Sequence, residues 1–156
     1  PTGNKVFWAR GNGWVYAGLI RILEDMPSNW PTRSQYLQLF QEMTDSIVKY
    51  QQPDGLWRSS LNEPSWFNKP ESSSSSFFCF GLCAGINKGY LDEAKYKQSA
   101  ISAWNGLLRL VNEQGRLGNT QLAASRPGEV QEQDYANYAQ GAFLLAASEI
   151  YKMNIE

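Results

Sequence analysis

The sequence predicts an all-α protein built as an α/α toroid, in which inner and outer helices alternate along the chain. Two observations predict this fold. Three segments that are apolar on nearly every side recur at steps of 64 and 63 residues, and two segments with a single apolar stripe lie between them. A helix that is apolar all round must be buried, whereas a one-sided helix covers a core. The alternation therefore predicts an inner ring of helices and an outer ring around it.

The predicted inner helices are rich in aromatic residues, glycine and alanine, and they span residues 13–23, 76–86 and 141–150. The serine run 72–76 leads directly into the second of them. Because serine is a favoured N-cap, we expect the run to open this helix, with hydroxyls toward the cavity, and not to form a linker.

The predicted outer helices span residues 36–50 and 96–111, with Asp92 as the expected N-cap of the second. Apolar residues recur on one face at steps of three and four, and charged or amide side chains occupy the other faces. About two and a half helix pairs are thus present, too few to close a ring. We expect the inner helices to expose an apolar side, which the rest of the barrel or another chain must cover.

The connections between these helices predict where a site lies. Those from inner to outer helices are short, whereas those from outer to inner helices are long, and residues 1–12 take the equivalent position before the first inner helix. In an up-and-down arrangement all long connections share one end of the toroid, and loops of this length are usually functional. Aromatic, basic and acidic residues at that end suggest a carbohydrate site. They are Trp8, Arg10, Asp54, Trp57, Arg58, Trp66, Glu71, Arg126 and Asp134.

Composition excludes several other classes of function. A net charge of −1 provides no attraction to nucleic acid or to anionic membranes, and no apolar run reaches the roughly 20 residues that span a bilayer. The absence of histidine excludes Ser–His–Asp and Cys–His catalysis within this chain. Cys79 and Cys83 are too few for a zinc site, so we expect no metal there and interpret them as buried thiols, not a redox pair. Asp54, before Gly55, is interpreted as a turn residue in preference to a catalytic one.

Five stretches of the chain carry a family resemblance when they are taken in order. They are WARGNGW at 8–14, DGLWR at 54–58, PESS through FF and GL at 70–82, GIN with G and LD at 85–92, and GAFLLA with SE at 141–149. Together they resemble the C-terminal part of the unsaturated rhamnogalacturonyl hydrolases of glycoside hydrolase family 105, which are related to the unsaturated glucuronyl hydrolases of family 88.

The resemblance implies an (α/α)6 barrel, with residues 1–156 forming the C-terminal part of that single domain. Members of the family remove the terminal unsaturated uronyl residue from oligosaccharides that lyases produce, by protonation and hydration of its C4–C5 double bond, without a metal or organic cofactor. The family's catalytic Asp precedes the segment that 8–14 resembles. No catalytic residue is therefore assigned here, and this part alone is expected to be inactive. A bacterial cytoplasmic or periplasmic location is expected on the same ground.

The resemblance transfers a substrate-binding role to Trp8, Arg10 and Trp14. A guanidinium can bind the substrate carboxylate with two parallel hydrogen bonds, and an indole can stack on a sugar ring flattened by its double bond. The other interpretation is that both tryptophans are core residues and that Arg10 has a structural partner. Two further questions stay open. The protein could be a non-catalytic carbohydrate-binding toroid, and the oligosaccharide could derive from rhamnogalacturonan, glycosaminoglycan or ulvan.

Overall fold

The structure is a computed structural model that describes residues 5–153. Within this range the chain forms five α-helices and one short 3-10 helix, and no strand: α1 (Ala9–Asp25), α2 (Arg33–Lys49), η1 (Pro64–Trp66), α3 (Ser72–Asn87), α4 (Glu93–Leu108) and α5 (Asn137–Lys152). The all-α prediction is confirmed, except that the first four residues of the predicted leading segment lie outside the described range. No helix between residues 5 and 153 has the length and hydropathy that a membrane span requires.

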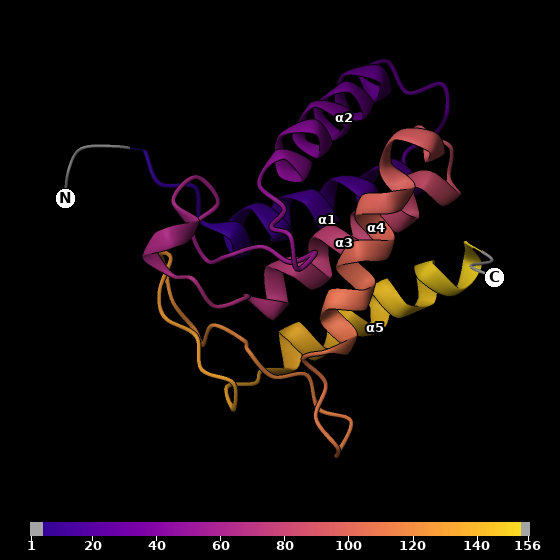
Figure 1. The fold of residues 1–156 in the computed structure, drawn as a ribbon. Helices are drawn as coiled ribbons and strands as arrows, with labels where there is room; N and C mark the ends of the chain where they lie inside the picture. Colours follow the sequence, from indigo (N-terminus) through magenta and orange to yellow (C-terminus); the bar gives the residue numbers. More distant parts are fainter. Residues whose placement is uncertain (1–4, 154–156) are drawn as a thin grey trace.

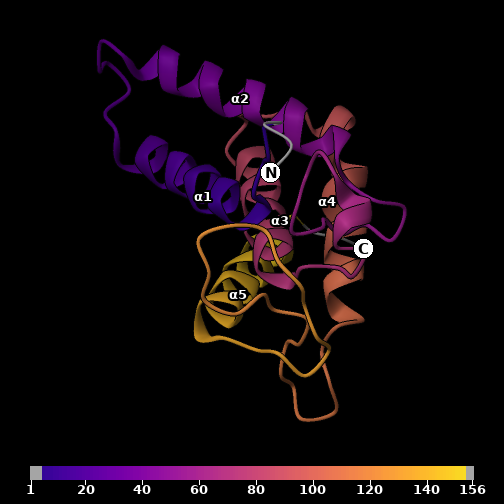
Figure 2. The same ribbon diagram turned by 90° about the vertical axis from the view of Figure 1, so that its left-hand side faces the viewer.

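The helices form two layers of an incomplete toroid (Figure 2). The inner layer consists of α1, α3 and α5, while α2 and α4 cover it from outside. The central helix α3 packs against α1, α4 and α5; α1 also packs against α2, and α4 against α5. The predicted alternation of inner and outer helices is therefore confirmed.

The core is centred on α3, of which 14 of 16 residues are buried. Phe78 lies between two aromatic rings, with centroid distances of 6.1 Å to Tyr16 of α1 and 5.1 Å to Trp57 of the connection before α3. Tyr16 in turn stacks on Phe40 of α2 at 4.8 Å, and its hydroxyl hydrogen-bonds to the hydroxyl of Thr44 at 2.7 Å. These contacts connect both layers through one aromatic cluster.

The other two inner helices are buried on one side only. Both α1 and α5 carry large apolar side chains that are 40% or more exposed: Trp14, Val15, Ile22, Leu144, Leu145 and Tyr151. The expectation that the inner helices are buried all round thus holds for α3 alone. The reason is geometrical, because α3 has inner-layer neighbours on both sides, whereas α1 and α5 each have one. The exposed apolar side that was predicted from the small number of helix pairs is therefore present on both α1 and α5.

Helix α3 begins at Ser72, where the serine run was expected to open it, whereas α1 and α5 begin one turn earlier than predicted, at residues 9 and 137 instead of 13 and 141. Their first turns are polar or glycine-rich, so the apolar pattern starts only in the second turn. The second outer helix ends at Leu108, before the predicted residue 111, because Val111 forms an isolated antiparallel bridge with Leu117. Asp92 is its N-cap as predicted and accepts a hydrogen bond from Ala94 N at 2.9 Å.

The long connections meet at one end of the molecule, on the left in Figure 1, and the short connections lie at the other end. Hydrogen bonds join the long connections to each other and to the inner helices, since Ala9 N donates to Ser59 O at 2.9 Å and Ser72 N donates to Asn119 O at 2.8 Å. The predicted grouping of the long loops is therefore confirmed.

The close approach of α1 to α3 predicts that Gly81→Ala destabilises the fold. A Cβ atom at position 81 would lie 2.2 Å from the Tyr16 ring, so the ring or the helix must move. We expect the free energy of unfolding to fall by about 1–3 kcal/mol. Gly18→Ala is the matched control, because its Cβ would meet nothing within 4 Å and alanine favours a helix interior. Urea denaturation followed by circular dichroism measures both, and an equal effect of the two changes would contradict the packing argument.

Candidate functional site

The first turn of α1 is fixed by two of the long connections. Trp8 forms an isolated antiparallel bridge with Ser60, and the amide of the next residue, Ala9, bonds to Ser59 as described above. The indole nitrogen of Trp8 donates to Gln121 Oε1 at 2.8 Å, in the connection between α4 and α5. Trp8 is half-buried between these loops, so it is neither a pure core residue nor a free stacking platform.

Arg10 is buried in this first turn, with only 4% of its surface exposed. Its Nη1 donates to the carbonyl of Gln121 and to the hydroxyl of Tyr138, the latter at 2.6 Å, and its Nη2 donates to the carbonyl of Leu122 at 2.9 Å. The guanidinium carbon lies 5.0 Å from the ring centroid of Trp8 and 4.9 Å from that of Tyr138, as in cation–π contacts. Arg10 therefore lies between two aromatic rings and orders the 121–122 backbone.

No carboxylate of residues 5–153 forms an ion pair with Arg10. Its described contacts use three of the five N–H groups of a guanidinium, and all three acceptors are neutral oxygens. A buried cation is costly unless its charge is compensated, and an anionic ligand is one means of compensation. The arrangement thus has the character of a carboxylate-binding position.

Gln121 joins the parts of this site. Its backbone oxygen accepts from Arg10 and, at 2.6 Å, from the hydroxyl of Tyr138. Its side-chain oxygen accepts from Trp8, as above, and its side-chain nitrogen donates to the carbonyl of Arg126 at 2.8 Å. One buried amide residue therefore contacts α1, α5 and its own loop.

Glu71, at the start of α3, also binds Gln121, through the backbone nitrogen of that residue. Its side chain is fully buried and is the N-cap of α3, where it accepts from Ser73 N at 3.2 Å and Ser74 N at 2.8 Å. The backbone nitrogen of Gln121 also donates to Glu71 Oε1, at 3.0 Å. The serine run opens the helix as predicted, but the predicted serine N-cap is wrong. A glutamate caps the helix because its longer side chain turns back over the first turn.

The five serine hydroxyls are buried, contrary to the expectation that they line a cavity. Those of Ser72, Ser73 and Ser74 bond to Thr120, to the carboxylate of Glu71 and to its carbonyl, and that of Ser75 accepts from Trp57 N at 3.0 Å. The first four hydroxyls thus form hydrogen bonds at the buried start of α3, whereas the described residues offer that of Ser76 no partner.

Trp14 is separate from this hydrogen-bonded group. It lies one turn after Arg10 on α1, is 52% exposed and packs its ring on Phe77 of α3, with centroids 4.4 Å apart and planes tilted by 46°. A half-exposed indole supported by a second ring is a suitable surface for stacking. Of the two tryptophans proposed to bind substrate, Trp14 is the one with an accessible face.

The other residues expected at the mouth have different positions. Asp54 accepts from Leu56 N at 3.0 Å and pairs with Arg58 at 2.8 Å, as a turn residue does. Trp57 is fully buried in the core, and its indole donates to Ile47 O at 2.8 Å. Trp66 is exposed in η1 and Asp134 accepts from Gln131 N at 3.0 Å within its own loop. Neither belongs to the group around Gln121.

Cys79 and Cys83 are free and fully buried, as predicted. The hydrogen bond that the Cys79 thiol donates to Cys83 and the burial of the side chain both raise the pKa of Cys79. These thiols are therefore packing residues of α3.

Two central residues were not identified from the sequence. Gln121 lies in a loop without periodicity, and Tyr138 lies before residue 141, where the third inner helix was predicted to begin. Burial raises the pKa of Tyr138 above its usual value, so its hydroxyl stays protonated and can donate to Gln121 while it accepts from Arg10. The available signal was the position of Tyr138 at the loop end of an inner helix, the same end at which Arg10 lies in α1.

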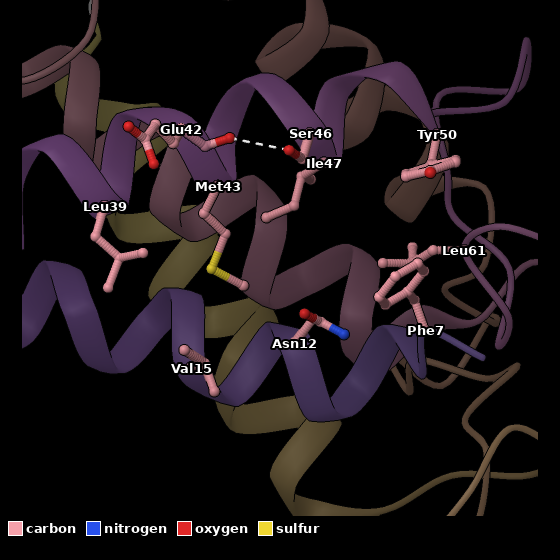
Figure 3. A pocket seen from close by; sticks show the side chains of 10 residues that line it. All are labelled: Phe7, Asn12, Val15, Leu39, Glu42, Met43, Ser46, Ile47, Tyr50 and Leu61. Atoms are coloured by element: carbon pink, nitrogen blue, oxygen red, sulfur yellow. Dashed lines mark hydrogen bonds between the residues drawn. The ribbon is translucent and has the colours of Figure 1, made fainter. Parts of the chain in front are cut away.

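A groove of about 430 Å³ lies between α1 and α2 (Figure 3). Its lining is mostly apolar, and it does not include Trp8, Arg10 or Trp14. Asn12 lines the groove from the first turn of α1, and its side-chain nitrogen donates to Trp8 O at 2.9 Å. The groove is therefore separate from the three residues that were expected to bind substrate. It is lined by Phe7, Asn12, Val15, Leu39, Glu42, Met43, Ser46, Ile47, Tyr50 and Leu61.

Two helical layers with a buried arginine and aromatic residues at one end define the class of α/α-toroid carbohydrate-active proteins. Comparison with known proteins specifies the family. The model described as Glycosyl Hydrolase Family 88 matches residues 1–154. The chain belongs to this family.

Individual relatives agree with this assignment. An "unsaturated 3S-rhamnoglycuronyl hydrolase" of Formosa agariphila is 40% identical over 153 residues, which are 98% of this chain and 41% of the relative. A glycosyl hydrolase family 88 structure from Bacteroides vulgatus is 36% identical with a TM-score of 0.90, covering 95% of this chain and 44% of that one. A possible family 105 member from Salmonella enterica serovar Paratyphi A is 25% identical with a TM-score of 0.83, covering 96% and 40%. The chain thus spans less than half the length of these relatives.

The position of the Tyr138 hydroxyl predicts a measurable contribution to stability. Tyr138→Phe removes the group that bridges Arg10 and Gln121 and leaves the ring in place, so we expect the free energy of unfolding to fall by about 1 kcal/mol. Tyr151→Phe is the control, because Tyr151 is 86% exposed, and its change should stay within about 0.5 kcal/mol. Urea denaturation measures both. A Tyr138→Phe variant as stable as the control variant would show that the bridge contributes nothing.

Proposed function

We propose that the complete protein removes the terminal unsaturated uronyl residue from oligosaccharides of the rhamnoglycuronyl type. Two findings support this: the family assignment and the name of the Formosa agariphila relative. The structural observation that carries the proposal is the buried Arg10 guanidinium, which has no carboxylate partner in residues 5–153 and lies between two aromatic rings. The substrate of such an enzyme has a carboxylate on a flattened ring, and this position suits that chemistry.

In the proposed reaction, a carboxylic acid outside this chain donates a proton to C4 of the double bond. Water then adds at C5 and gives one proton to the carboxylate that the acid has become, which restores the acid. The product is a hemiketal, which opens and releases the sugar next to it. No residue of this chain carries the proton in this scheme, and its contribution is to bind and orient the substrate.

Trp8, Arg10 and Trp14 divide the binding between them. Arg10 donates its remaining N–H groups to the uronyl carboxylate, and Trp14 stacks on the ring with its exposed face. Trp8 supports the guanidinium from one side and, through Gln121, fixes the loop beside it. In this proposal Arg10 has both a structural role and a binding role. Its neutral acceptors orient the guanidinium, and its positive charge stays available for the substrate carboxylate.

The exposed apolar faces of α1 and α5 are also explained by this proposal. The groove between α1 and α2 and the exposed side chains of α5 lie on the sides where α1 and α5 have no further inner-layer neighbour. We propose that further helix pairs of the barrel cover both faces and bring the acid to the mouth.

Replacement of Arg10 tests the proposed function. The complete protein is incubated with a lyase-generated unsaturated rhamnoglycuronyl disaccharide, and the ultraviolet absorbance of the conjugated double bond is followed. We expect the absorbance to fall with the wild-type protein. Arg10→Lys should lower kcat/KM on the order of 10- to 100-fold, because lysine retains the charge but cannot bind the carboxylate with a fixed fork.

Arg21→Ala is the matched control, since Arg21 lies on the exposed side of α1, with 62% of its side chain accessible and only Glu24 as an ion-pair partner. It should retain wild-type kcat/KM. Failure of the wild-type protein to consume rhamnoglycuronyl, rhamnogalacturonyl or glucuronyl substrates, with retained binding of any of them, would instead support a non-catalytic carbohydrate-binding toroid.

A further inference from the structure

We propose that Glu71 is a positioning residue for Arg10, and that it acts through the backbone of Gln121. The carboxylate of Glu71 accepts a hydrogen bond from the backbone nitrogen of Gln121. The carbonyl oxygen of Gln121 in turn accepts a hydrogen bond from the Arg10 guanidinium. This inference rests on the proposed function, in which Arg10 binds the substrate carboxylate.

The carboxylate of Glu71 is almost saturated with hydrogen bonds. Besides the amides of Ser73 and Ser74, its two oxygens accept from the Ser73 hydroxyl at 2.7 and 2.9 Å, and Oε1 accepts from Gln121 N at 3.0 Å. The side chain is fully buried. Such a carboxylate is held in one orientation, because any rotation leaves buried donors without acceptors.

Helix capping alone does not require this residue. Aspartate, asparagine and serine are the favoured N-caps, and glutamate is not among them. Asp92 caps α4 at the other end of the molecule with one described hydrogen bond, to Ala94 N, and it is exposed. Glu71 has one methylene more than aspartate, and the contact that this length makes possible is the one to Gln121, 50 residues further along the chain.

The effect reaches Arg10 in a single step. Gln121 bonds to Glu71 through its nitrogen and to Arg10 through its oxygen, so a shift of this residue moves the acceptor of the guanidinium. It also moves the acceptor of the Tyr138 hydroxyl, which bonds to the same oxygen. Because the guanidinium follows its acceptor, this backbone position determines how well Arg10 meets the substrate carboxylate, and its displacement weakens substrate binding.

Glu71→Asp separates the two roles of Glu71. Aspartate retains the charge and the helix cap, but it is too short to reach Gln121. In the complete protein we expect an increase in KM for the unsaturated disaccharide of about 10-fold, with kcat within about 2-fold of wild type. Hydrogen exchange of the peptide that contains residues 119–122 should become faster, because the Gln121 amide loses its acceptor.

Asp92→Glu is the matched control, since it changes the length of an N-cap carboxylate by one methylene at the opposite end of the molecule. It should leave KM and the exchange of residues 119–122 unchanged. Equal KM values for the two variants, or unchanged exchange in Glu71→Asp, would overturn the positioning role. If Glu71→Asp does not fold, Glu71→Gln allows the same comparison, because glutamine keeps the length and replaces one accepting oxygen with a donor.

The two proposals can fail separately. If the wild-type protein consumes no unsaturated uronyl substrate, the proposed function fails. Hydrogen exchange then still decides whether Glu71 holds Gln121, because this measurement needs no turnover. If the protein is active and only the Glu71 variants behave like the Asp92 control, the positioning role fails and the function stands.

Discussion

The burial of nearly all of α3 is the constraint from which the other features of this structure follow. A helix without a polar face needs neighbours on every side, and α1, α4 and α5 provide them. Close neighbours require small residues at the crossings, as at Gly81 against Tyr16. Burial also extends to the N-terminus of α3, where the first amides of a helix have no acceptors within it. Glu71 accepts from the amides of Ser73, Ser74 and Ser75, and the carbonyl of Asn119 accepts from that of Ser72, so the loops that bear the site are attached to this point.

Glu71 and Arg10 are buried charges of opposite sign that do not touch. Each is costly in isolation, and each is stabilised by hydrogen bonds to neutral groups and not by a direct ion pair. A direct ion pair would use the donors of the guanidinium and reduce its attraction for an anion. Separation through the backbone of Gln121 avoids this loss, so the site combines rigidity with a charge that remains available.

The sequence predicted the layered fold because burial and periodicity are coupled within single helices. It also placed the long loops at one end, since the direction of alternating helices determines where each connection lies. The first turns of α1 and α5 were missed, because the residues there follow contacts with the loops and not an apolar period. The role of Gln121 could not be predicted for a related reason. Its partners, Glu71 and Trp8, are 50 and 113 residues away, and only the packed loops bring them together.

The connection between α4 and α5 alternates between exposed and buried stretches, and this has an evolutionary consequence. Residues 112–116 and 122–126 are exposed tips, whereas Leu117, Asn119, Thr120 and Gln121 between them are buried. Exposed tips tolerate insertions and deletions far better than buried backbone does. The loop can therefore change length at the 112–116 tip, which in the proposed function would alter the rim offered to longer oligosaccharides, while the segment from Leu117 to Arg126 keeps Arg10 in place. Under the proposed function, a preference for oligosaccharide length could thus diversify without a change at the residues that bind the terminal sugar.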